Sequence, residues 1–298
     1  MKFLVNTLVI TTLLAGLVAC GGQKSSEGEE VADTTAYDEA TKDLPTSSVW
    51  ANLPDAEQVA AVIHLTGAEY VDGLANDPAN VEYYLDDAEG KQAAAVGVYF
   101  SDIAYATMYE KGDVAYDAFL SAQKIAENLG TARSLNQAIA ERFKERLDGN
   151  DEAHKVLDEA FDSANENLRT EGRELLSAAS LSGWYVEGLY LLTQLVQNYP
   201  AEGLDEETKN LVLLPLTQGI LKQGKLLNQV IAIVEEVKPD NTRADYFVYD
   251  LYDLKESFDK INIDEVIENA DPSTMISTED LAEITAKTAT LRERIVAP

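Results

Sequence analysis

Apolar residues recur at every third or fourth position along most of the chain from Trp50 onward, and this spacing limits the fold more than any other feature. A period near 3.6 residues is typical of helices that bury one face. No sustained alternation of apolar and polar residues is bounded by hairpin turns, so we expect no sheet. The sequence therefore predicts an all-α domain of eight or nine helices over residues 49–298.

Prolines, glycines and capping residues divide this domain into separate helices. Pro54 stands in the first turn of the first helix, and Ser134 with Gln137 forms a capping box for a later one. Pro215 falls inside a long helix and predicts a kink there. The predicted helices cover residues 54–76, 91–110, 114–129, 134–147, 150–168, 173–198, 206–237, 243–261 and 277–296.

These helices are expected to form a compact bundle or an array of helical hairpins. Residues 49–148 and 150–262 make two halves, followed by a C-terminal helix over 277–296. Three residues recur at an offset of 91: Gly97, Tyr99 and Gly112 return as Gly188, Tyr190 and Gly203. Such a repeat would fit two stacked halves, with a tetratricopeptide-like solenoid as the alternative fold.

The first nineteen residues have the pattern of a secretion signal. A single basic residue, Lys2, precedes the uncharged run 3–19, which is shorter than the roughly 20 residues that a spanning helix needs. The run ends in Leu17-Val18-Ala19-Cys20, which resembles the lipobox of bacterial lipoproteins. The resemblance implies cleavage before Cys20 and acylation of its sulfur, with chains such as palmitate, so the expected partner is a lipid bilayer.

Residues 20–48 are rich in Gly, Ser, Thr, Asp and Glu and predict a flexible acidic tether. An acidic stretch soon after the lipidated cysteine resembles the surface-export signal of Bacteroidetes lipoproteins. The segments 99–109 and 182–194 are similar to uncharacterised helical lipoproteins of the same group, which carry no known activity. Together these resemblances imply an outer-membrane lipoprotein on the periplasmic face or the cell surface.

The charge of the chain excludes some partners. Fifty-three acidic residues against 23 basic ones give a net charge of −30, which disfavours binding to nucleic acid. Cys20 is the only cysteine, so neither an internal disulfide nor a multi-cysteine metal site can form. His64 has alanines one turn away on both sides, and His154 with its acidic neighbours is typical of a solvated helix start. We expect no metal and no cofactor.

Two short motifs suggest nucleotide hydrolysis, but their context does not fit. Residues 219–225 have the spacing of a P-loop, yet they fall inside a helical pattern and are followed by Leu226 where Ser or Thr is needed. Residues 151–154, Asp-Glu-Ala-His, match the acidic box of helicases, but the buried strand that should precede such a box is absent from the predicted elements. The chain is therefore predicted not to be an enzyme.

Two carboxylates give the best candidate for a ligand site. Asp102 is the only charge in residues 92–109, and Glu187 is the only charge in residues 175–198. Both segments are apolar on nearly every side, which is typical of central helices, and small residues such as Gly97 and Gly183 would let them approach closely. The predicted ligand-binding residues are Asp102, Glu187, Tyr99, Tyr105, Trp184 and Tyr190.

Two interpretations of these acids remain open: a polar cavity lined by tyrosines, or core carboxyls satisfied by internal hydrogen bonds. The favoured function is a membrane-anchored binding or scaffolding module for another envelope protein or a small ligand. The alternative function is a carboxylate-dependent envelope hydrolase.

Overall fold

Helices make up all the regular secondary structure in the part of the chain that the computed structural model describes, which is residues 66–131, 133, 135–149, 153–200, 202–237, 245–263 and 281–297. Within these ranges the chain forms nine α-helices and one short 3-10 helix, without any strand. The predicted all-α class is confirmed. The predicted signal, Cys20, the tether and His64 lie outside the described residues.

The helices begin and end near the prolines, glycines and capping residues that the sequence places between them. The 3-10 helix η1 and the nine α-helices are η1 (Pro78–Asn80), α4 (Val81–Leu85), α5 (Glu89–Met108), α6 (Gly112–Asn128), α7 (Gln137–Gly149), α8 (Ala153–Thr170), α9 (Glu174–Gln197), α10 (Glu206–Val237), α11 (Asp245–Phe258) and α13 (Ala282–Val296). Asn136 caps α7, two residues later than the predicted cap, because its side-chain oxygen accepts the backbone N–H groups of Ala138 and Ile139 at 3.0 and 3.2 Å.

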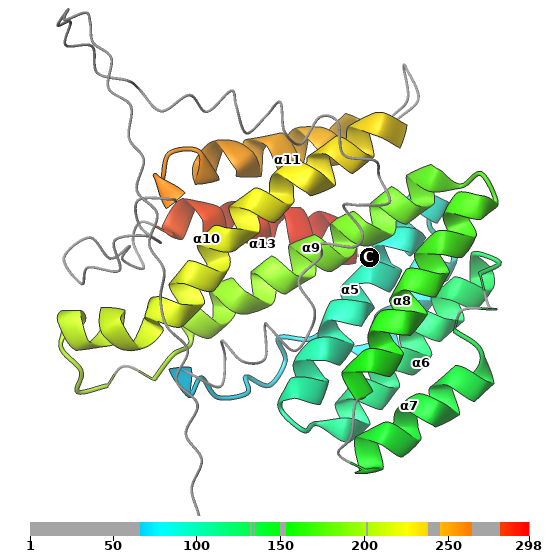
Figure 1. Cartoon of the computed structure of the whole chain (residues 1–298), viewed down its shortest axis with the longest axis horizontal. Helices are drawn as coiled ribbons and strands as arrows, with labels where there is room; N and C mark the ends of the chain where they lie inside the picture. Colours follow the sequence, from blue (N-terminus) through cyan, green and yellow to red (C-terminus); the bar gives the residue numbers. More distant parts are fainter. Residues whose placement is uncertain are drawn as a thin grey trace, which may run out of the picture. The chain divides into compact units, whose positions relative to one another are not determined.

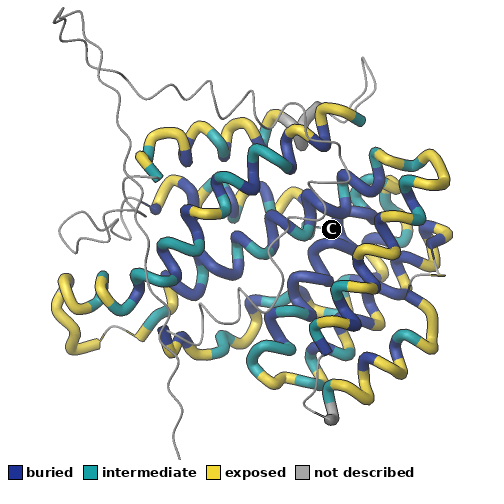
Figure 2. Tube along the Cα trace, in the orientation of Figure 1, coloured by how far each residue is buried: buried dark blue, intermediate teal, exposed yellow. Residues whose placement is uncertain are grey.

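The helices α5 and α9 form the centre of the bundle (Figure 1). Each is apolar on most sides and is buried along most of its length (Figure 2), as expected for central helices. The helices α6 and α8 pack on α5, while α8, α10 and α13 pack on α9. Because α5 and α9 come from the two predicted halves, those halves share one hydrophobic core and form a compact bundle.

Residues 67–76 are irregular, so the prediction of a helix reaching Asn76 is wrong. Gly67 and Gly73 have φ angles of +64° and +81°, a conformation that a helix does not contain. Tyrosine hydroxyls hold this segment against the bundle instead: Tyr105 accepts the Val71 N–H at 2.9 Å. The segment leads into η1 and places the residues just before it against α5.

Candidate functional site

Two glycines let the backbones of α5 and α9 touch. A Cβ atom added at Gly97 would lie 1.9 Å from the Ser180 carbonyl oxygen, and one at Gly183 would lie 2.0 Å from the Ala94 carbonyl oxygen. Any other residue at these positions would force the helices apart. The close approach that the small residues predicted is therefore present.

This contact brings Asp102 of α5 and Glu187 of α9 together in the interior, where neither residue has any exposed surface. The backbone N–H and the side-chain amide of Asn76 each donate to Asp102 Oδ2 at 3.1 Å. On the other side, Arg292 of α13 donates from Nε to Glu187 Oε2 at 2.7 Å. The guanidinium also donates to the Leu74 carbonyl oxygen at 3.2 Å and to Asn76 Oδ1 at 3.3 Å.

The burial of the two carboxyl groups favours one bound proton for the pair. Asp102 Oδ1 and Glu187 Oε1 are buried without a hydrogen-bond partner, and each carboxyl group lies close enough to be affected by the other. Two ionised carboxylates at such a contact repel, and burial penalises each charge, so one of them keeps its proton. Burial raises the pKa of Asp102 well above its ordinary value, and the negative charge of Glu187 raises it further. The protonated pair and the Arg292 guanidinium then sum to zero charge.

The predicted aromatic residues do not form one cavity around these acids. Tyr99 donates its hydroxyl to the Asp77 carbonyl oxygen at 3.2 Å, and Tyr105 bonds the backbone of Val71. The Tyr190 ring covers Arg292, whose guanidinium carbon lies 4.2 Å from the ring centroid. A ligand role for Asp102 and Glu187 remains a prediction, although their complete burial and internal partners are those of core groups.

Arg292 and Asn76 complete this buried cluster, and neither was predicted from the sequence as a site residue. Arg292 lies between other charged residues in a helix of mixed polarity, so nothing in the sequence distinguishes it from a surface arginine. Asn76 was assigned to a helix that does not extend so far. The one available signal was indirect, because two buried acids need a buried cation or a proton.

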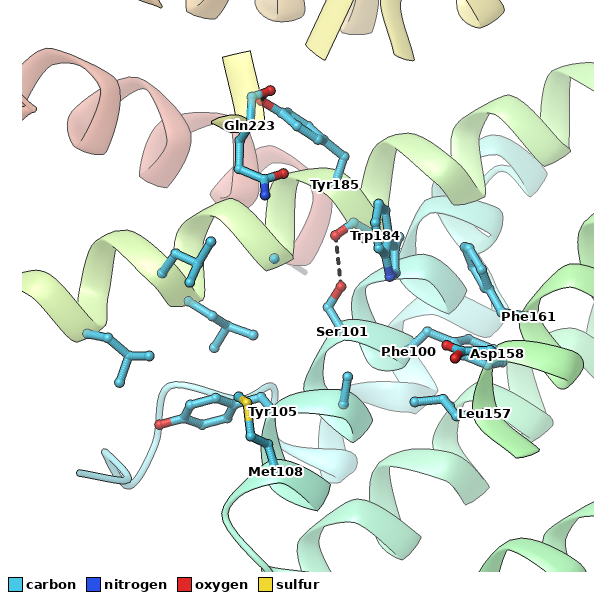
Figure 3. A pocket seen from close by; sticks show the side chains of 15 residues that line it. Phe100, Ser101, Tyr105, Met108, Leu157, Asp158, Phe161, Trp184, Tyr185 and Gln223 are labelled. Atoms are coloured by element: carbon cyan, nitrogen blue, oxygen red, sulfur yellow. Dashed lines mark hydrogen bonds between the residues drawn. The ribbon is translucent and has the colours of Figure 1, made fainter. Parts of the chain in front are cut away.

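A cleft lies on another side of the α5–α9 pair and is bordered by α8 and α10 (Figure 3). It opens to solvent, its inner space is about 90 Å³, and it is lined mainly by aromatic and aliphatic side chains. Of the predicted ligand residues, Trp184 and Tyr105 line it, whereas Asp102 and Glu187 do not. Ser101 lies in its wall and donates its hydroxyl to the Trp184 carbonyl oxygen at 2.8 Å.

No protein-family model, curated protein or solved structure matches this chain. Among the described residues no group of His, Cys, Asp or Glu side chains is arranged to hold a metal ion. In the same ranges no helix is long and apolar enough to span a bilayer. The P-loop-like residues 219–225 lie inside α10.

The space around Gly188 shows that the cleft is open in its middle. A Cβ atom added there would meet nothing closer than Ser101 Oγ, at 3.8 Å. Gly188 thus differs from Gly97 and Gly183, where the same addition collides with backbone. A Cβ atom at position 188 therefore fits without separating α5 from α9.

Proposed function

We propose that this chain is a lipid-anchored envelope protein that binds a small, largely apolar ligand in the cleft beside α5 and α9. The cleft carries the proposal because it combines an apolar lining with a few polar groups, the usual character of small-molecule sites. The lipobox-like residues 17–20 support the anchor, and the acidic stretch after Cys20 supports a tether that keeps the domain clear of the bilayer.

The cleft favours a small ligand over a protein partner because it is concave and lies between helices, where a flat protein surface would not enter. The carboxylate-dependent hydrolase receives no support from Asp102 and Glu187. Neither has exposed surface, so a substrate cannot reach them while the bundle is closed. Binding is therefore the function that the geometry supports best.

Acylation is tested by metabolic labelling with a radiolabelled or alkyne-tagged fatty acid. We expect label on the wild-type chain and none on Cys20→Ala, which should leave the membrane fraction because Cys20 is the only thiol available for acylation. Label that persists on Cys20→Ala would contradict the anchor.

Ligand binding is tested with the fluorescence of Trp184. The chain has only one other tryptophan, Trp50, so Trp50→Phe isolates the signal of the cleft. We expect 1-decanol to shift the Trp184 emission in a saturable way, and Gly188→Leu to abolish the shift by filling the cleft. Leucine favours helix more than glycine does, so the variant should keep its thermal stability. Saturation that Gly188→Leu does not alter would contradict binding in this cleft.

A further inference from the structure

Gly188 lies at the open floor of the cleft. A Cβ atom added there would meet only Ser101 Oγ, at 3.8 Å. Trp184 lies one turn before Gly188 on α9, and Leu191 and Leu192 lie one turn after it. Helical residues three or four positions apart are neighbours on one face. An aromatic side chain and two aliphatic ones therefore border the open floor.

Three aromatic rings form one wall of the cleft (Figure 3). The ring centroids of Phe100 and Phe161 lie 4.9 Å apart, and those of Phe161 and Trp184 lie 6.1 Å apart. The ring planes are tilted by 49° in the first pair and by 31° in the second. Contacts between aromatic rings stabilise beyond the effect of burial alone. This wall therefore favours an aromatic ring in the ligand over a saturated ring of the same size.

One polar side chain of the lining is available to a ligand. The hydroxyl groups of Ser101, Tyr105 and Tyr185 line the cleft, and each already donates to a backbone carbonyl oxygen. Gln223 reaches the cleft from α10, where its carbonyl oxygen accepts the Tyr185 hydroxyl at 3.1 Å. Its side-chain amide makes no hydrogen bond within the part of the chain that the structure describes. The amide therefore offers N–H donors and an acceptor oxygen.

The charges of the lining disfavour an ionic ligand. No lysine, arginine or histidine is among the described lining residues. Asp158 is the one acidic residue among them, and it already interacts within the protein. A charged ligand would lose its water in the cleft without gaining a counter-ion. The lining therefore suits a neutral molecule.

The size of the cleft suits a molecule with a single ring. A closed apolar cavity of about 150 Å³ takes up one benzene molecule. The inner space of this cleft is smaller, about 90 Å³, but it opens to solvent. A single ring can therefore lie on the floor at Gly188 while its substituent extends toward the mouth.

We propose that the ligand is a neutral molecule with one aromatic ring and one hydroxyl group, bound with its ring over Gly188 against Trp184 and its hydroxyl on the Gln223 amide. This inference rests on the proposed function, because it names the ligand class of the same cleft. It differs from the uptake of any apolar molecule because it requires an aromatic ring and a hydrogen bond to one particular side chain.

The test uses phenol as the probe, with cyclohexanol and toluene as matched controls. Cyclohexanol keeps the hydroxyl group and the ring size but is not aromatic, whereas toluene keeps the aromatic ring and lacks the hydroxyl group. Binding is measured by Trp184 emission in the full-length Trp50→Phe protein at neutral pH, with excitation at the red edge of the tryptophan band, where phenol and toluene absorb little. Only binding that Gly188→Leu abolishes is counted as binding in the cleft.

We expect phenol to bind about threefold or more tightly than cyclohexanol, because it packs on the aromatic wall. Gln223→Leu should weaken the binding of phenol about fivefold, since the hydrogen bond is lost, and should leave the binding of toluene unchanged. Gln218→Leu is the matched control, because it makes the same change on α10 outside the described cleft lining, and it should alter neither affinity.

The outcomes separate this inference from the proposed function. If phenol and cyclohexanol bind equally, or Gln223→Leu leaves the ratio of phenol to toluene affinity unchanged, the inference is overturned while binding of 1-decanol still supports the cleft. If Gln218→Leu weakens phenol as much as Gln223→Leu does, the hydrogen bond is not made at Gln223 and the inference is also overturned. If neither these three molecules nor 1-decanol binds, both proposals fail.

Discussion

Replacing Asp102 by asparagine should make the protein more stable at neutral pH, although it alters a fully buried polar residue. Asparagine has the shape of a protonated aspartic acid. Its oxygen can accept from Asn76 as Oδ2 does now, and its amide can donate to Glu187 Oε1, a buried oxygen that has no partner in the wild type. Glu187 would then be ionised and paired with Arg292, so the cluster remains neutral without binding a proton.

The magnitude follows from that one proton. An unfolded chain releases the Asp102 proton near pH 3.8, whereas the folded pair keeps it because burial and Glu187 raise the pKa. The stability contributed by the proton is complete below pH 3.8 and is lost as the pH rises toward the folded pKa. Each pH unit in this window costs the wild type about 1.4 kcal/mol that Asp102→Asn does not lose. The variant should therefore gain stability relative to the wild type as the pH rises above 4.5.

The assay is urea unfolding of both proteins from pH 4.5 to 7.5 at constant ionic strength. Glu187→Gln, which also removes the shared proton, should reduce the slope as well. Glu82→Gln is the control, because Glu82 is an exposed acid paired with Lys124 and should leave the slope unchanged. Wild type and Asp102→Asn curves that run parallel over the whole range would refute the shared proton.

Four further substitutions test the packing and the pairing of buried groups. Gly183→Ala should lower the free energy of unfolding by about 3 kcal/mol or more, because its Cβ collides with backbone, whereas Gly188→Ala should not lower it. Arg292→Met should destabilise by about 3–5 kcal/mol near neutral pH and by less near pH 4.5, where Glu187 can be protonated instead; equal losses at both pH values would contradict the pairing. Tyr105→Phe should cost about 1 kcal/mol by removing the acceptor of the Val71 N–H. Chemical denaturation measures all four.

Much of the bundle could be predicted because prolines, glycines and capping residues mark the ends of its helices in the sequence. The single charges in residues 92–109 and 175–198, together with Gly97 and Gly183, were enough to predict that Asp102 and Glu187 lie on central helices that approach closely. The irregular segment 67–76 could not be predicted from apolar periodicity, because the same spacing continues through Gly67. Hydrogen bonds from distant tyrosines hold its neighbours, because Tyr199 donates to the Thr66 carbonyl oxygen and Tyr109 donates to the Ala68 carbonyl oxygen.

The rest of the site depends on contacts between distant parts of the chain. Arg292 is 105 residues from its partner Glu187, and no local pattern marks the pairing. The cleft was missed for a similar reason. Phe100, Phe161 and Leu195 belong to three different helices, and in the sequence each has the spacing of an ordinary core residue. Only the packing decides which apolar residues meet one another and which leave space between them.

The position of Arg292 on α13 has a consequence for the order of folding. During synthesis α5 and α9 emerge before α13, so a partly folded bundle can join Asp102 to Glu187 before their cation is present. Until α13 docks, only protons can neutralise the two acids, and the intermediate must bind more of them than the finished protein does. Refolding should therefore slow as the pH rises, and docking of α13 should release protons into the medium.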